Sequence, residues 1–106
     1  MSTDDLARLG QGYGRGIEFF THGNFTRAID EWEAVYRAAP RFKQVSEYLV
    51  KAYQYLGMEH YANHEYDRAL EVWNKILSVD SDNEKAIRYI NKTKDELSRL
   101  EGITSR

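Results

Sequence analysis

The sequence of 106 residues contains no cysteine, only one proline and no excess of basic residues. Without cysteine the chain cannot form disulfides, thiolate zinc sites or a cysteine nucleophile, although its redox compartment stays undetermined. Because the net charge is −2, we expect no nucleic-acid partner and no electrostatic attraction to an anionic membrane. The apolar runs are only a few residues long, so we also expect no direct membrane insertion.

The N-terminal residues 1–5 show neither a basic region nor a following apolar stretch, so we expect no signal peptide. This leaves the compartment unknown but favours the cytoplasm. A content of 42% hydrophobic and 30% charged residues is typical of a folded globular protein, and the length suits a single domain covering 1–106. Short helical arrays are often parts of longer chains, so the sequence also fits one piece of a longer repeat protein, with 103–106 as a linker.

An internal repeat becomes visible when the sequence is aligned with itself at a shift of 41 residues. Gly16 then matches Gly57, and Trp32 matches Trp73. Further matched pairs are Glu18 with Glu59, Arg27 with Arg68, Ala28 with Ala69, Tyr48 with Tyr89, and Lys51 with Lys92. The chain therefore consists of two repeats, at about 4–40 and 42–81, followed by half of a third.

The apolar residues of each repeat recur at helical spacing, which predicts an all-α protein. Gly23 can adopt the left-handed conformation that ends a helix, and Asn24 can cap the next one. Pro40 ends the second helix, and Ser81 with Glu84 resembles a capping box. The predicted helices cover 4–22, 24–38, 42–62, 65–79 and 82–101. The repeat unit is thus two antiparallel helices joined by a tight turn.

The last predicted helix, about 82–101, has a narrow apolar stripe and is charged elsewhere. The stripe consists of Ile87, Ile90, Leu97 and Leu100. Because the last unit of a helical array has no neighbour to cover it, a polar outer face is expected there. We interpret this segment as a capping helix.

These residues resemble the tetratricopeptide repeat, in which a small residue of the first helix is followed by an alanine, an aromatic residue and a proline. In the first copy the resemblance is carried by Gly16, Phe19, Gly23, Phe25, Ala28, Trp32 and Pro40, and in the second by Leu56, Gly57, Tyr66, Ala69 and Trp73. The period of 41 exceeds the usual 34 by seven residues, which would lengthen the first helix of each pair. The resemblance implies a fragment of an α-solenoid with about five helices.

The same resemblance implies a concave groove, lined by the first helix of each pair, that takes a protein or peptide partner. The groove positions are Tyr13, Ile17, Phe20, Gln54, Met58 and Tyr61, which are unusually apolar for an exposed surface. Lys51, Lys85, Arg88 and Lys92 would form a cationic rim for the carboxylates of a partner. These positions predict a scaffold or adaptor. The alternative is a structural domain whose apolar face is covered by its own last helix or by a second copy in a homo-oligomer.

Other chemistries have weaker signals. Glycine alternates from Gly10 to Gly16, but a phosphate loop also needs a preceding strand or a lysine followed by serine or threonine, so we expect the glycines to weaken the first helix. His60 and His64 have a spacing that suits zinc, and Glu59 or Glu65 could add a carboxylate. The glutamate of a HExxH motif is missing, however, and position 60 corresponds to an inward aromatic position, so we interpret them as a packing and a turn histidine. No nucleophile converges with a base. We therefore expect no enzyme activity, cofactor or metal.

Overall fold

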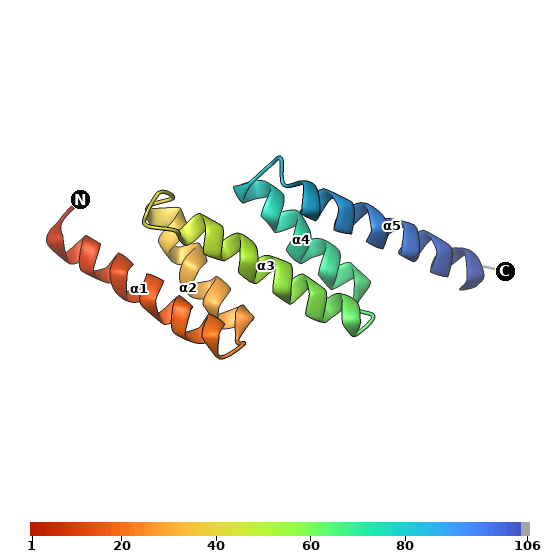
Figure 1. The fold of residues 1–106 in the computed structure, drawn as a ribbon, viewed down its shortest axis with the longest axis horizontal. Coiled ribbons are helices and arrows are strands. Elements are labelled where there is room, and N and C mark those ends of the chain that lie inside the picture. Colours follow the sequence, from red (N-terminus) through yellow and green to blue (C-terminus); the bar gives the residue numbers. More distant parts are fainter. Residues whose placement is uncertain (105–106) are drawn as a thin grey trace. The chain divides into compact units, whose positions relative to one another are not determined.

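The computed structural model describes residues 1–104, and within this range the chain is all-α, without strands, as the sequence predicts. The five helices are α1 (Thr3–Thr21), α2 (Phe25–Ala38), α3 (Val45–Ala62), α4 (Tyr66–Val79) and α5 (Glu84–Thr104) (Figure 1). All ten helix boundaries lie within three residues of those predicted. The third helix begins at Val45, three residues later than expected, because the chain turns at Lys43 with a φ of 46°.

The chain divides into two compact units, Met1–Ala52 and Tyr53–Arg106, which we call the first and second units. The first unit contains α1, α2 and the N-terminal half of α3. The second contains the rest of α3 together with α4 and α5. Within the first unit α1 and α2 run antiparallel, and within the second α4 and α5 run antiparallel (Figure 1).

The turn between α1 and α2 follows the prediction. Gly23 adopts a φ of 76°, in the left-handed region that glycine occupies without strain. Asn24 caps α2, because its Oδ1 accepts a hydrogen bond from the backbone N–H of Arg27 at 3.2 Å. The backbone N–H of Asn24 donates to the carbonyl of Phe19 at 2.8 Å, which closes the turn.

The turn between α3 and α4 has the same backbone path but no glycine. His64 replaces Gly23 and is held at a φ of 61°, a conformation that costs a residue with a Cβ roughly 1 kcal/mol. The backbone N–H of Glu65 donates to the carbonyl of His60 at 2.8 Å, as Asn24 does to Phe19 in the first repeat. The repeat therefore preserves the turn geometry even where the residues differ.

The start and the end of α5 differ from the prediction. The helix begins at Glu84 and is capped by Asn83, whose Oδ1 accepts from the N–H of Ala86 at 2.9 Å. The capping box expected at Ser81 is therefore wrong, because asparagine is an equally good cap and lies directly before the helix. At the other end α5 continues through Ile103 and Thr104, where a linker was expected. The linker's last two residues, 105–106, lie outside the described part.

Each unit has a core built from the matched positions of the repeat. Ala28 and Trp32 of α2 are fully buried in the first unit, and the equivalent Ala69 and Trp73 of α4 are 0% and 3% exposed in the second. The alternating glycines were expected to weaken the first helix. They do not interrupt it, and α1 is continuous from Thr3 to Thr21.

Candidate functional site

The centre of each unit is a tryptophan that packs directly on a glycine. In the first unit the indole of Trp32 lies on Gly16, so that a Cβ placed on Gly16 would lie 2.1 Å from Nε1. In the second unit Trp73 lies on Gly57 with the same separation. Only glycine permits this approach of the ring to the helix backbone.

The two indoles are also held by equivalent hydrogen bonds. Nε1 of Trp32 donates to the carbonyl of Tyr13 at 3.0 Å, and Nε1 of Trp73 donates to the carbonyl of Gln54 at 3.3 Å. Both acceptors lie three residues before the glycine, on the helix that the indole contacts. The repeat seen in the sequence is therefore a repeat of side-chain geometry as well.

A partly exposed surface covers the buried tryptophan of the first unit. We call it the first patch, and it consists of Ile17, Phe20, Tyr48 and Lys51. The ring of Tyr48 stacks on Trp32 at 5.3 Å between centroids, and the ring of Phe20 lies 5.7 Å from that of Trp32. The Nζ atom of Lys51 lies 5.9 Å from the centre of the Tyr48 ring, within the range of a cation–π contact.

The second unit carries the equivalent surface, which we call the second patch. It consists of Met58, Tyr61, Tyr89 and Lys92, each 41 residues after its counterpart in the first patch. The rings of Tyr61 and Tyr89 lie 6.0 Å and 5.2 Å from Trp73. Met58 is 49% exposed, a large fraction for an apolar side chain surrounded by aromatic rings.

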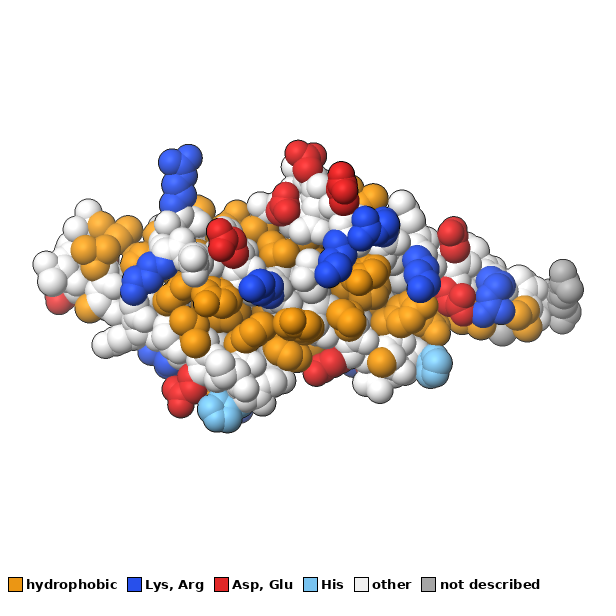
Figure 2. Space-filling model, in the orientation of Figure 1, with side chains coloured by type: hydrophobic (Ala, Val, Ile, Leu, Met, Phe, Trp, Pro, Cys, Tyr) orange, Lys and Arg blue, Asp and Glu red, His pale blue; other side chains and the backbone are white. Residues whose placement is uncertain are grey.

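The second patch surrounds a pocket of about 280 Å³. Met58 and Tyr61 of α3, Trp73 of α4, and Tyr89, Lys92 and Thr93 of α5 line it. Over the C-terminal half of α3 and the adjoining part of α5, Figure 2 shows hydrophobic side chains gathered beside lysine and arginine side chains. The fully buried Thr93 donates its hydroxyl proton to the carbonyl of Tyr89 at 2.7 Å, so this polar side chain is already satisfied.

A larger pocket of about 430 Å³ lies between α1 and α2 of the first unit. Its apolar wall includes Leu9 and Val35, and its charged wall includes Arg15 and Glu31. These two charges are paired, because Nη2 of Arg15 lies 2.9 Å from Oε2 of Glu31. The hydrogen bond that Arg15 donates to the carboxylate of Glu31 raises the pKa of the guanidinium, which stays charged.

The predicted groove residues have different surroundings in the structure. Ile17, Phe20 and Tyr61 are half-buried, and Met58 is exposed. Gln54 is half-buried and accepts the indole hydrogen bond through its backbone.

Tyr13 is a core residue, so its assignment as an exposed anchor is wrong. It is only 9% exposed, and its ring packs edge-on against Phe42 and Tyr48 at 5.9 Å and 6.0 Å. Burial raises the pKa of its phenol above the ordinary value. The spacing of Tyr13 suited the groove, but the segment before α3 folds back and covers its ring.

All four residues of the predicted cationic rim are exposed. Lys51 belongs to the first patch, whereas Lys85, Arg88 and Lys92 lie on one face of α5 at helical spacing. Of these three, Lys92 lines the pocket of the second patch. The structure thus places one lysine in each patch at the same repeat position.

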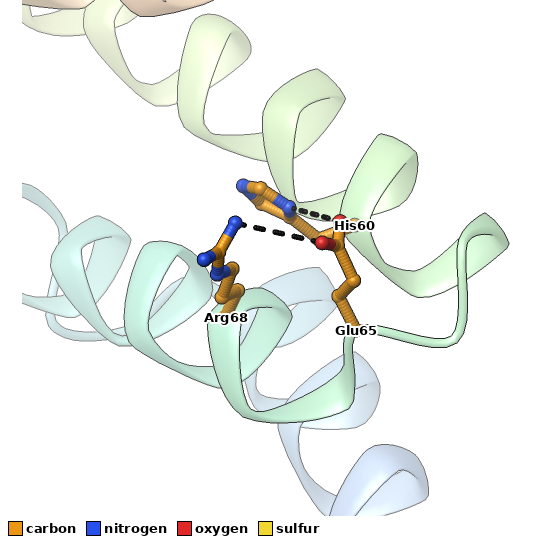
Figure 3. Close-up of polar contacts among 3 residues, drawn as sticks. All are labelled: His60, Glu65 and Arg68. Carbon is orange, nitrogen blue, oxygen red and sulfur yellow. Dashed lines mark hydrogen bonds and ion pairs between the residues drawn. The ribbon is translucent and has the colours of Figure 1, made fainter.

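The two histidines with zinc-like spacing face different partners. Nδ1 of His60 donates to Oε1 of Glu65 at 3.0 Å, and Nη1 of Arg68 lies 3.5 Å from Oε2 of the same carboxylate (Figure 3). His64 shares a hydrogen bond with the hydroxyl of Tyr66 at 3.0 Å. Within residues 1–104 no three metal-ligating side chains come together.

This ionic cluster joins α3 to α4, and the first repeat uses different chemistry for the same contact. There the guanidinium of Arg27 lies 5.8 Å from the centre of the Phe19 ring. Phe19 and Arg27 are the counterparts of His60 and Arg68. The His60 hydrogen bond lowers the pKa of Glu65, and the nearby charge of Arg68 adds to this effect.

The sequence-based prediction of the groove did not include the two tyrosines of the patches that pack on the buried tryptophans. Tyr48 and Tyr89 align at the repeat spacing, but no groove role was assigned to them. A signal for them was available in the sequence. Tyr48 and Tyr89 repeat at the same spacing of 41 residues as Trp32 and Trp73, and two aromatic pairs that share one spacing indicate a repeated aromatic cluster.

No known family profile and no curated protein sequence matches this chain. Within the described part of the chain, none of the helices combines the length and the apolar character needed to cross a membrane.

Proposed function

We propose that this chain is a tetratricopeptide-like interaction module with a binding rather than a catalytic role, and that its patches bind a segment of a partner protein. The observation that carries the proposal is the repetition of one partly exposed apolar arrangement. Each unit presents an aliphatic or thioether side chain, two aromatic rings over a buried tryptophan, and a lysine at the edge.

The composition of the patches supports this role. Aromatic residues and methionine are enriched at protein interfaces, and exposed apolar clusters carry a risk of aggregation unless they have a use. Met58 is the clearest case, because nearly half of its side chain surface is exposed beside a pocket large enough to hold another side chain. A methionine also adapts its shape to different partners.

The proposal is tested by affinity capture from a lysate of the source cells with the wild type, Met58→Glu and Ile103→Glu. Ile103 is a matched control, since it is 57% exposed in the same unit but does not line the pocket. We expect proteins that are retained by the wild type and by Ile103→Glu but lost with Met58→Glu. Equal retention by all three, with unchanged helical circular dichroism, would contradict the role of the second patch.

A second candidate is self-association through α5. Ile87 is 40% exposed on this helix, which favours contact with another copy. Sedimentation velocity over a hundredfold range of concentration tests it. A monomer at every concentration would exclude this candidate, whereas a dimer that Ile87→Glu dissociates would support it.

A further inference from the structure

Lys92 is the one charged side chain among the described residues that line the pocket of the second patch. The other walls are mainly the aromatic rings of Tyr61, Trp73 and Tyr89 and the side chain of Met58. The polar atoms of Thr93 and of the Trp73 indole are already engaged within the unit. The ammonium group is therefore the charge that a ligand in this pocket would meet.

The side chain of Lys92 is exposed on α5 and brings a positive charge to the edge of the pocket. Two other cations of the second unit form ion pairs, Arg68 with Glu65 and Arg99 with Glu96. Glu96, one helical turn further along α5, is paired with Arg99, whose hydrogen bond lowers the pKa of this carboxyl, and the charge of Lys92 adds to that effect. Lys85 and Arg88 extend the same face of α5, so positive charge continues beyond the pocket.

The size of the pocket indicates what enters it. A dry cavity of about 150 Å³ already binds a benzene molecule, and the volume here is about 280 Å³. One large apolar side chain, such as leucine or phenylalanine, therefore fits with room for the adjoining backbone. An ammonium group at the wall of such a pocket favours a carboxylate over an amide or a cation.

We propose that the second patch recognises an acidic segment of a partner protein, with a bulky apolar side chain in the pocket and a neighbouring aspartate or glutamate on Lys92. This inference rests on the proposed function and adds the chemistry of the partner. The first patch is less suited to the same selection, because Lys51 already lies over the ring of Tyr48.

The experiment uses three capped ten-residue peptides that share one central phenylalanine. Aspartates flank it in the first peptide, asparagines in the second and lysines in the third. Each is titrated into the ¹⁵N-labelled full chain at low salt, and amide shifts of α3 and α5 report binding. We expect the aspartate peptide to bind about five- to tenfold more tightly than the asparagine peptide, with shifts centred on the pocket, and the lysine peptide to bind most weakly.

Variants of α5 then test the assigned lysine. Lys92→Gln should abolish the preference for aspartate over asparagine, and Lys92→Glu should reverse it in favour of the lysine peptide. Lys94→Gln is the matched control, because Lys94 is exposed on the same helix but does not line the pocket, and it should keep the wild-type preference.

Several results would overturn the inference. Equal binding of the aspartate and asparagine peptides, or an unchanged preference in Lys92→Gln, would show that charge plays no part, while the apolar role of the pocket would stand. No binding of any peptide would also overturn it. The proposed function would then be decided separately by the capture experiment with Met58→Glu.

Discussion

Two glycines of α1 should respond to the same substitution with opposite signs. In Gly16→Ala the new Cβ would lie 2.1 Å from Nε1 of Trp32 and 2.5 Å from two ring carbons. An ordinary contact needs about 3.5 Å, so the indole must retreat by about 1.4 Å. Gly14 lies on the same helix with nothing within 4 Å of its would-be Cβ.

The magnitudes follow from the contacts that are lost. Overpacking costs about 1–3 kcal/mol. The displacement of the indole also breaks the buried hydrogen bond that Nε1 of Trp32 donates to the carbonyl of Tyr13, at a cost of about 1–3 kcal/mol. The higher helix propensity of alanine compared with glycine offsets about 1 kcal/mol of this loss. Gly16→Ala should therefore lose about 3 kcal/mol, whereas Gly14→Ala should gain up to about 1 kcal/mol.

The free energy of unfolding is measured by urea titration of the wild type and both variants, followed by circular dichroism and tryptophan fluorescence. Gly16→Ala should lower the midpoint by about 1–2 M, and Gly14→Ala should raise it slightly. If Gly16→Ala were as stable as Gly14→Ala, the close packing of indole on glycine would be refuted.

Three further predictions concern the cores and turns. Trp32→Ala and Trp73→Ala should each lower the free energy of unfolding by about 3–5 kcal/mol, because both side chains are buried; tolerance of either in urea titrations would contradict the core assignment. Gly23→Ala should cost about 1 kcal/mol and His64→Gly should gain up to that amount, because both positions have positive φ; thermal melts of the two variants should shift in opposite directions. The His60 hydrogen bond, followed by the charge of Arg68, lowers the folded pKa of Glu65, so its stabilisation is present above the unfolded pKa, near 4, and is lost as the pH falls through the folded value. Melting temperatures between pH 7 and pH 3 should fall less steeply in Glu65→Gln than in the wild type, and parallel curves would count against this pair.

The sequence was sufficient to predict the helices because their apolar spacing and turn residues agree. The turn at Gly23 and Asn24 was confirmed in detail, since local chemistry decides it. The cap of α5 was not, because Ser81 and Asn83 are both good caps and the choice depends on where α4 ends.

The candidate site was harder to predict, since it depends on contacts between helices. Gly16 and Trp32 were both identified as important, but nothing in a helical pattern shows that the indole lies on the glycine. Tyr13 has the spacing of a surface residue, and only the fold of residues 42–48 around its ring makes it buried. The pocket beside Met58 is lined by residues of α3, α4 and α5, and the spacing of apolar residues along the sequence does not specify how three helices pack.

The two tryptophans also give the chain an intrinsic fluorescence signal for each of its units. Its only two tryptophans occupy equivalent places, one in each compact unit, and each is fixed by a bond from Nε1 to a helix carbonyl. Replacing one of them with phenylalanine leaves a single emitter whose spectrum describes one unit alone. Fluorescence can thus follow the loosening of each half of this protein separately, without any attached dye.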